Sequence, residues 1–143
     1  QPILVLIRGD DRMRWTVLLA GVLGAIGVAI GAHAAHGLEA MLLEQGVAPE
    51  AITKRLEQCD VAVRYHMLHA LVLLILGLLA PAVMAKRRTL AVGLFLLGIA
   101  LFSGGLYSMV YLGQMGHWAI VPSGGLCFIL GWCCTATLAV QSD

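Results

Sequence analysis

The sequence predicts an all-α membrane protein built as an up-down bundle of four transmembrane helices. Of its 143 residues, 60% are hydrophobic and only 12% are charged, whereas a soluble domain carries charge on about a quarter of its residues. Four long apolar segments follow one another at about residues 15–35, 67–85, 90–112 and 118–140. Each segment is long enough to cross a hydrocarbon layer of about 30 Å as a helix. A lipid-facing surface therefore explains the composition.

The four segments are expected to be helices because a chain inside lipid must satisfy its own backbone hydrogen bonds. The alternative, a β-barrel, requires strands in which apolar and polar residues alternate over about ten residues. The run Leu-Val-Leu-Leu-Ile-Leu at residues 71–76 shows no such alternation. The sequence therefore favours helices over strands.

Residues 13–143 are expected to form one four-span domain, since this length suits a single domain. Met13 is followed by Arg14 and Trp15, which together resemble the start of a membrane protein. Residues 1–12 are accordingly interpreted as an N-terminal extension or a remnant of cloning, and they are left out of the fold prediction.

A hydrophilic segment at residues 39–65 separates the first two spans. Pro49 within it suits the first turn of a helix. After Pro49, apolar residues recur at helical spacing and charged residues occupy the opposite face; the apolar residues are Ile52, Leu56, Cys59 and Val63. This pattern predicts a short amphipathic helix, which either lies on the membrane interface or extends the second span outward.

Basic residues predict the orientation of the bundle. Arg14 precedes the first span and Lys86, Arg87 and Arg88 separate the second from the third, whereas the loop at residues 113–117 contains neither Lys nor Arg. The positive-inside rule then places the N- and C-termini and the turn at residues 86–88 in the cytoplasm. The expected location is the inner, or plasma, membrane of a bacterium.

Four histidines are the candidate ligands of a metal ion. His33 and His36 close the first span, and His66 and His69 open the second. Residues three apart share a helix face, and the two antiparallel helices are expected to bring all four imidazoles to one depth. Four imidazoles can hold a Zn²⁺ or Cu²⁺ ion. Two alternatives stay open: the histidines make only structural hydrogen bonds at the interface, or two of them bind haem.

Small residues and two polar residues indicate how the spans pack. The chain has seventeen glycines, and Gly27 and Gly31 form a pair four residues apart in the first span. Such residues let membrane helices approach closely, within one bundle or between copies. Ser103 and Tyr107 are four apart in the third span and are expected to point inward, toward the histidines or the backbone near Pro122.

The sequence contains no pattern that indicates catalysis. No Asp, Glu, Lys or Arg lies in the core of any span, and no nucleophile arrangement or phosphate-binding loop is present. The chain is therefore expected not to be an enzyme. The sequence favours a structural or accessory membrane subunit, with the lipid bilayer and a second copy or a larger membrane complex as partners. A net charge of +1 gives no reason to expect nucleic acid.

Four short strings, taken together, resemble a known family. Residues 31–38 (Gly-Ala-His-Ala-Ala-His-Gly-Leu) resemble the Gly-Ala-x-Gly-Ala-His-Gly-Leu signature of the domain of unknown function 423 family, whose eukaryotic members are called transmembrane protein 256. Residues 64–71 are similar to its Tyr-Gln-x-x-His-Ala-Leu segment, residues 101–107 to Leu-Phe-Ser-Gly-Ser-x-Tyr, and residues 121–125 to Thr-Pro-x-Gly-Gly. The matched positions are Gly31, His36, Gly37, His69, Ser103, Gly104, Tyr107, Pro122, Gly124 and Gly125.

The resemblance implies a small four-span membrane protein and no particular reaction. His33 and His66 depart from the family pattern, which has other residue types at these positions, and residues 39–60 form a longer segment than the family pattern suggests. A metal site that includes His33 and His66 would therefore be an elaboration of this chain, while His36 and His69 belong to the shared motif.

Overall fold

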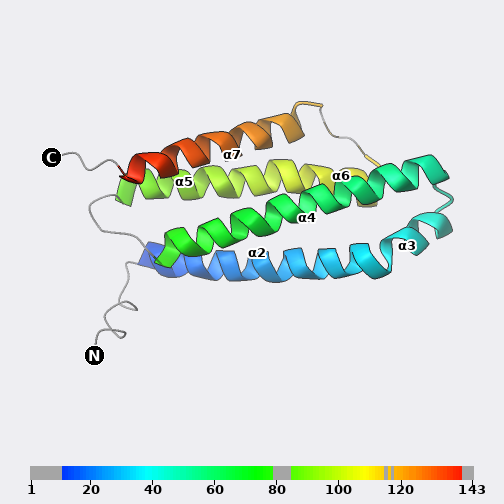
Figure 1. Ribbon diagram of the computed structural model, residues 1–143, viewed down its shortest axis with the longest axis horizontal. Helices are drawn as coiled ribbons and strands as arrows, with labels where there is room; N and C mark the ends of the chain where they lie inside the picture. Colours follow the sequence, from blue (N-terminus) through cyan, green and yellow to red (C-terminus); the bar gives the residue numbers. More distant parts are fainter. Residues whose placement is uncertain (1–10, 79–84, 115, 117, 140–143) are drawn as a thin grey trace.

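The structure is a computed structural model that describes residues 11–78, 85–114, 116 and 118–139. Every regular element in this part of the chain is helical (Figure 1). In chain order the elements are α2 (Asp11–His36), α3 (Leu38–Glu44), α4 (Pro49–Leu78), α5 (Ala85–Gly98), the π-helix η2 (Ile99–Ser103), α6 (Gly104–Leu112), α7 (Ile120–Ala136) and the 3₁₀-helix η3 (Thr137–Ala139).

Among the described residues, four helical stretches are long and apolar enough to cross a membrane: Asp11–His36, Pro49–Leu78, Lys86–Leu112 and Ile120–Ala139. Successive stretches run in opposite directions, so the start of α2 and the end of α7 lie at the same end of the bundle (Figure 1). The prediction of an all-α protein with four spans in up-down order is confirmed.

The charged segment before the second span is the first half of α4, which is one continuous helix of 30 residues. Of the two alternatives, an extension of the second span is therefore correct. The short α3 precedes it and packs back on it, because Leu38 and Leu42 are fully buried in one cluster with Ile52 of α4. Gly46 makes the turn between α3 and α4 with a φ of 72°, in the left-handed region that favours glycine.

Several predicted boundaries differ from the structure. α2 begins at Asp11, so residues 11 and 12 of the predicted extension are helical, while residues 1–10 lie outside the described part. The second span is described as far as Leu78, and Ala85 begins α5 instead of ending the second span. The fourth span begins at Ile120, which puts Pro122 in its first turn, where the missing N–H of proline needs no partner.

Helix α4 lies at the centre of the bundle. α2 packs mainly on α4, while α7 packs mainly on α5 and η2 (Figure 1). Two apolar clusters fill the two halves. One contains Leu73 of α4, Phe95 of α5 and Phe128 of α7, and the other contains Leu42 of α3 and Val110 of α6. Four polar or charged residues are also buried in the described part of the bundle, namely His66, His69, Arg88 and Ser103.

Glycines permit the closest helix contacts, as the sequence predicts. A Cβ atom on Gly27 would lie 2.5 Å from the sulfur of Met67, and a Cβ on Gly31 would lie 3.3 Å from Val63, so both glycines face α4. By contrast, Gly21 and Gly24 have no atom within 4 Å of their Cβ positions. The same helix therefore presents small residues both to its own bundle and away from it.

The third span is interrupted by the π-helix η2, in which each backbone bond spans five residues instead of four. Its last residue, Ser103, is fully buried and points inward as expected. The Ser103 hydroxyl donates to the backbone carbonyl of Ala62, at 3.0 Å. This bond attaches the irregular turn of the third span to the middle of α4.

Candidate functional site

His66 of α4 and Tyr107 of α6 form a part-buried pair. The Tyr107 hydroxyl lies 3.2 Å from Nδ1 of His66, and His66 is 3% exposed. On the other side of the ring, a Cβ on Gly27 of α2 would lie 3.7 Å from Cγ of His66. The second ring nitrogen, Nε2, is buried without a hydrogen-bond partner among the described residues. The inward direction expected for Tyr107 is confirmed.

Both ring nitrogens of His69 form hydrogen bonds. Its Nδ1–H donates to the Tyr65 carbonyl at 2.7 Å, and Nε2 accepts from the indole N–H of Trp132 at 3.3 Å. A carbonyl only accepts and an indole only donates, so these bonds require the neutral ring with its proton on Nδ1. The ring also stacks on Phe128 with a centroid distance of 3.6 Å. His69 thus fixes α7 against α4 through specific polar and aromatic contacts.

The two histidines of α2 are exposed near its end. Nδ1 of His33 lies 3.1 Å from the hydroxyl of Tyr111, which joins the last turn of α2 to the last turn of α6. His36 has no hydrogen-bond partner within the described part of the chain and lines a cavity instead. His33 therefore contacts another helix, whereas His36 faces a cavity.

The four histidines do not lie in one layer. Gly31 of α2 faces Val63 of α4 and Gly27 faces Met67, which places His33 and His36 level with about residues 58–61 of α4. At a helical rise of 1.5 Å per residue, His66 and His69 then lie roughly 8 to 16 Å deeper. No three His, Cys, Asp or Glu side chains in the described segments come together as a metal site requires. His117, the fifth histidine of the chain, lies outside those segments.

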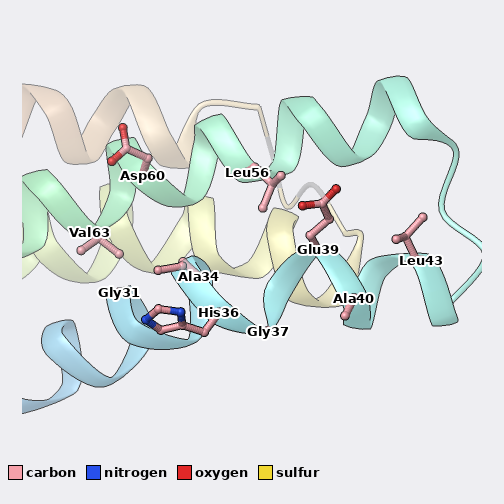
Figure 2. A pocket seen from close by; sticks show the side chains of 11 residues that line it. Gly31, Ala34, His36, Gly37, Glu39, Ala40, Leu43, Leu56, Asp60 and Val63 are labelled. Carbon is pink, nitrogen blue, oxygen red and sulfur yellow. The ribbon is translucent and has the colours of Figure 1, made fainter.

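A cavity of about 720 Å³ opens where α2, α3 and α4 meet. Figure 2 shows its polar side chains at separate points of the lining: His36 from α2, Glu39 from α3 and Asp60 from α4. Most of the remaining wall is small or apolar and includes Gly31 and Val63. The cavity combines an apolar wall with two carboxylates and one imidazole.

Comparison with known proteins now decides the family. Residues 30–125, more than half of the chain, match the family described as "Protein of unknown function (DUF423)". The chain belongs to the DUF423 family. The resemblance carried by the four strings is therefore confirmed, since all four lie inside the matched region.

Relatives of this DUF423 protein are named as membrane proteins. The UPF0382 membrane protein YwdK of Bacillus subtilis (strain 168) is 35% identical over 132 residues, which cover 90% of this chain and 98% of the relative. A UPF0382 membrane protein of Haemophilus influenzae is 36% identical over 114 residues, covering 80% of this chain and 84% of that relative. No solved structure matches the chain. The four apolar spans and these relatives together show that the chain is a membrane protein.

The DUF423 motif residues fall into three structural groups. One group, Gly31, His36 and Gly37, lines the cavity. A second group belongs to the buried polar contacts and contains His69, Ser103 and Tyr107. In the third group, Gly124 and Gly125 of α7 face Phe102 of η2, while Gly104 begins α6 and Pro122 lies in the first turn of α7.

Sequence reasoning missed several partners of these residues. Trp132, Tyr65 and Tyr111 bond the histidines, and none of the three was predicted to do so. Tyr111 follows Tyr107 by four residues, which is a helical spacing that could have placed both tyrosines on the same face. The contact of Trp132 with His69 has no comparable signal, because it depends on how α7 is rotated against α4.

Proposed function

We propose that this DUF423 protein is a structural or accessory membrane subunit, and not an enzyme, that assembles with a second copy or a larger membrane complex. The observation that supports this proposal is the surface of α2. Ala20 and Gly27 are the buried residues of this 26-residue helix, whereas ten residues of α4 are buried. Most of α2 is therefore available to lipid or to another protein.

The composition of the free face of α2 suits contact with another helix. Gly21 and Gly24 have open space at their Cβ positions, and the larger neighbours Val22 and Val28 are about half exposed. Small residues that face away from their own bundle let another membrane helix approach closely. The buried polar groups His69 and Ser103 are used within the bundle, which fits a packing role better than catalysis.

The proposal includes the orientation expected from the charges. The N- and C-termini and the basic turn at residues 86–88 would face the cytoplasm of a bacterium, and the cavity would open on the opposite side of the inner membrane. The up-down order supports this arrangement in one respect, since the start of α2 and the end of α7 lie at the same end of the bundle (Figure 1).

Native mass spectrometry of the full chain, released from mild detergent, tests the assembly proposal. We expect a defined oligomer or a stoichiometric partner. Replacing Gly21 and Gly24 with leucine should remove most of the assembled form by blocking close helix contact. The control is Gly93→Leu on α5, because Gly93 also has open space around its Cβ position. A wild-type monomer without a partner, or equal loss in the control, would contradict the proposal.

Metal binding is a second candidate and stays a prediction. It is favoured by the ligand types near the end of α2, where exposed His33 and His36 lie three residues apart and His36 shares a cavity with Glu39 and Asp60. Elemental analysis of protein purified without a histidine tag should find about one Zn or Cu ion per chain, and His33→Ala/His36→Ala should remove it. Sub-stoichiometric metal in both samples would dispose of this candidate, and a visible spectrum without a Soret band would dispose of haem.

A further inference from the structure

The two buried histidines of α4 differ in how their hydrogen bonds constrain them. Both bonds of His69 go to groups with a fixed role, a carbonyl that only accepts and an indole that only donates. His66 is 3% exposed, its Nδ1 lies 3.2 Å from the Tyr107 hydroxyl, and its Nε2 has no hydrogen-bond partner among the described residues. A hydroxyl both donates and accepts. Of the two rings, His66 is therefore the one that can change its protonation without losing a contact.

His66 can take up a proton by the reversal of one hydrogen bond. In the neutral ring with its proton on Nε2, Nδ1 accepts from the Tyr107 hydroxyl. When this hydroxyl gives its proton to Nδ1 and takes another proton in exchange, the ring becomes an imidazolium and its Nδ1–H donates to the tyrosine oxygen. The heavy atoms of the pair can stay in place. The backbone of Leu23 in α2 also interacts with the ring, and its carbonyl is an acceptor that suits a protonated nitrogen.

Groups that can pass a proton lead from Tyr107 to the end of the bundle at which α2 ends. Tyr111 follows Tyr107 by four residues on α6, and its hydroxyl lies 3.1 Å from Nδ1 of the exposed His33. Cys59 of α4 is fully buried in the same cluster and interacts with both tyrosine hydroxyls. Imidazole, phenol and thiol groups each donate and accept. Each group can give its proton toward His66 while it takes one from the side of His33, so every group in the series is restored.

The described structure continues this series in one direction only. On the other side of His66, α2 and α4 contribute to an apolar cluster that includes Ala20, Leu73 and Leu76. His69 also lies on that side, but both of its nitrogens are engaged. A proton can therefore reach His66 from the end at which His33 lies, and the described residues offer no comparable way out toward the start of α2.

Few titratable groups surround His66. Tyr107 contacts it, and Cys59, Tyr111 and His33 follow farther out. Helix α5 carries its titratable residues at 86–88, at the opposite end of the bundle, and η2 contains none. The acidic residues of α3 are Glu39, which lines the cavity, and the exposed Glu44, and Asp60 of α4 pairs with Arg64 at the surface. The oxygens available to an imidazolium at His66 are thus those of Tyr107 and Leu23.

We propose that His66 is a proton-binding site inside the membrane, which receives its proton through Tyr107 from the end of the bundle at which His33 lies. Ionisable groups within membrane spans are rare, and they commonly take part in proton relays. The unpartnered Nε2 is explained if the site serves two protonation states instead of one fixed hydrogen-bond pattern. The inference is independent of the assembly proposed above, because it concerns the interior of a single bundle.

Solid-state NMR of the full chain, labelled with nitrogen-15 histidine and reconstituted in phosphatidylcholine vesicles, tests the site. Imidazole nitrogen shifts separate the two neutral tautomers from the imidazolium. Between about pH 8 and about pH 5, we expect His66 to change from neutral to imidazolium, while His69 stays neutral with its proton on Nδ1. His69 is the control within the same sample, since it is equally buried on the same helix. A His66 that stays neutral, or equal protonation of both rings, would overturn the proposal.

Three variants test the route of the proton. Tyr107→Phe keeps the ring and removes the hydroxyl, so at about pH 5 the ratio of imidazolium to neutral His66 should fall about tenfold or more, as expected for the loss of a hydrogen bond to a charged group. Tyr111→Phe should leave this ratio unchanged and slow the exchange between the two forms. Trp132→Phe, which removes a bond from His69 instead, is the control and should change neither quantity at His66.

The variants are decisive in both directions. An unchanged ratio in Tyr107→Phe, an unchanged exchange rate in Tyr111→Phe, or an equal fall of the ratio in Trp132→Phe contradicts the proposal. If Tyr107→Phe fails to fold, the comparison of His66 with His69 in the unmodified chain still decides whether the site binds a proton.

Discussion

Replacing Gly124 with alanine is expected to lower the free energy of unfolding by about 3 kcal/mol, near the upper end of the usual cost of overpacking. The added Cβ would clash with the backbone nitrogen of Phe102 and would lie 2.8 Å from its Cα. These atoms belong to the π-helix η2, so the clash falls on backbone and cannot be relieved by rotating a side chain. The helix α7 would have to move away from the third span.

The next residue provides the control for this prediction. A Cβ on Gly125 would lie 3.8 Å from the ring of Phe102, which is an ordinary van der Waals contact. Gly125→Ala should therefore change the free energy of unfolding by less than about 0.5 kcal/mol. Thermal melts followed by circular dichroism in one detergent should separate the two variants by roughly 5 °C or more. Equal melting temperatures would show that α7 and η2 are not in close contact.

Replacing His69 with alanine is expected to cost about 3 kcal/mol of stability as well. The substitution removes a ring that is 1% exposed, leaves a space against Phe128, and deprives the Trp132 indole of its acceptor. His36→Ala is the control, because the His36 side chain is exposed and should change stability by less than about 0.5 kcal/mol. Melting curves of the two variants in the same detergent check the difference.

A double-mutant cycle isolates the hydrogen bond of Trp132 to His69. Trp132→Phe keeps an aromatic ring beside Phe95 and removes the donor. We expect a coupling energy of about 1 kcal/mol between His69→Ala and Trp132→Phe, since the bond can be lost only once. Strictly additive effects would mean that the indole does not donate to His69 in the membrane-embedded protein.

The spans could be predicted from the sequence because their signal is local. An apolar run of about twenty residues leaves few alternatives in lipid, and the structure has helices at all four runs. The helical spacing of Ile52, Leu56, Cys59 and Val63 likewise indicated a helix before the second span. Whether this helix lay on the interface or joined α4 could not be decided, because both arrangements need the same apolar stripe.

The candidate site was harder to predict, since it depends on register and rotation. The apolar run that begins at residue 67 predicts that His66 and His69 open the second span, level with His36. α4 already begins at Pro49, so the two histidines lie well inside the helix. Their partners Tyr107 and Trp132 come from helices far along the chain. Periodicity gives the faces of each helix, but it does not tell which faces meet.

The π-helix at Ile99–Ser103 determines in which direction the side chains that follow it in the third span point around the helix axis. One residue advances an α-helix by about 100°, and a π-turn accommodates one residue more than an α-turn does. If the same residues formed an α-helix, Tyr107 and Tyr111 would be rotated by about 100° relative to Phe95, away from His66 and His33. The extra residue thus rotates the second part of the span relative to the first. Phe95 can therefore contact Trp132 of α7, while Tyr107 and Tyr111 contact the histidines of α4 and α2.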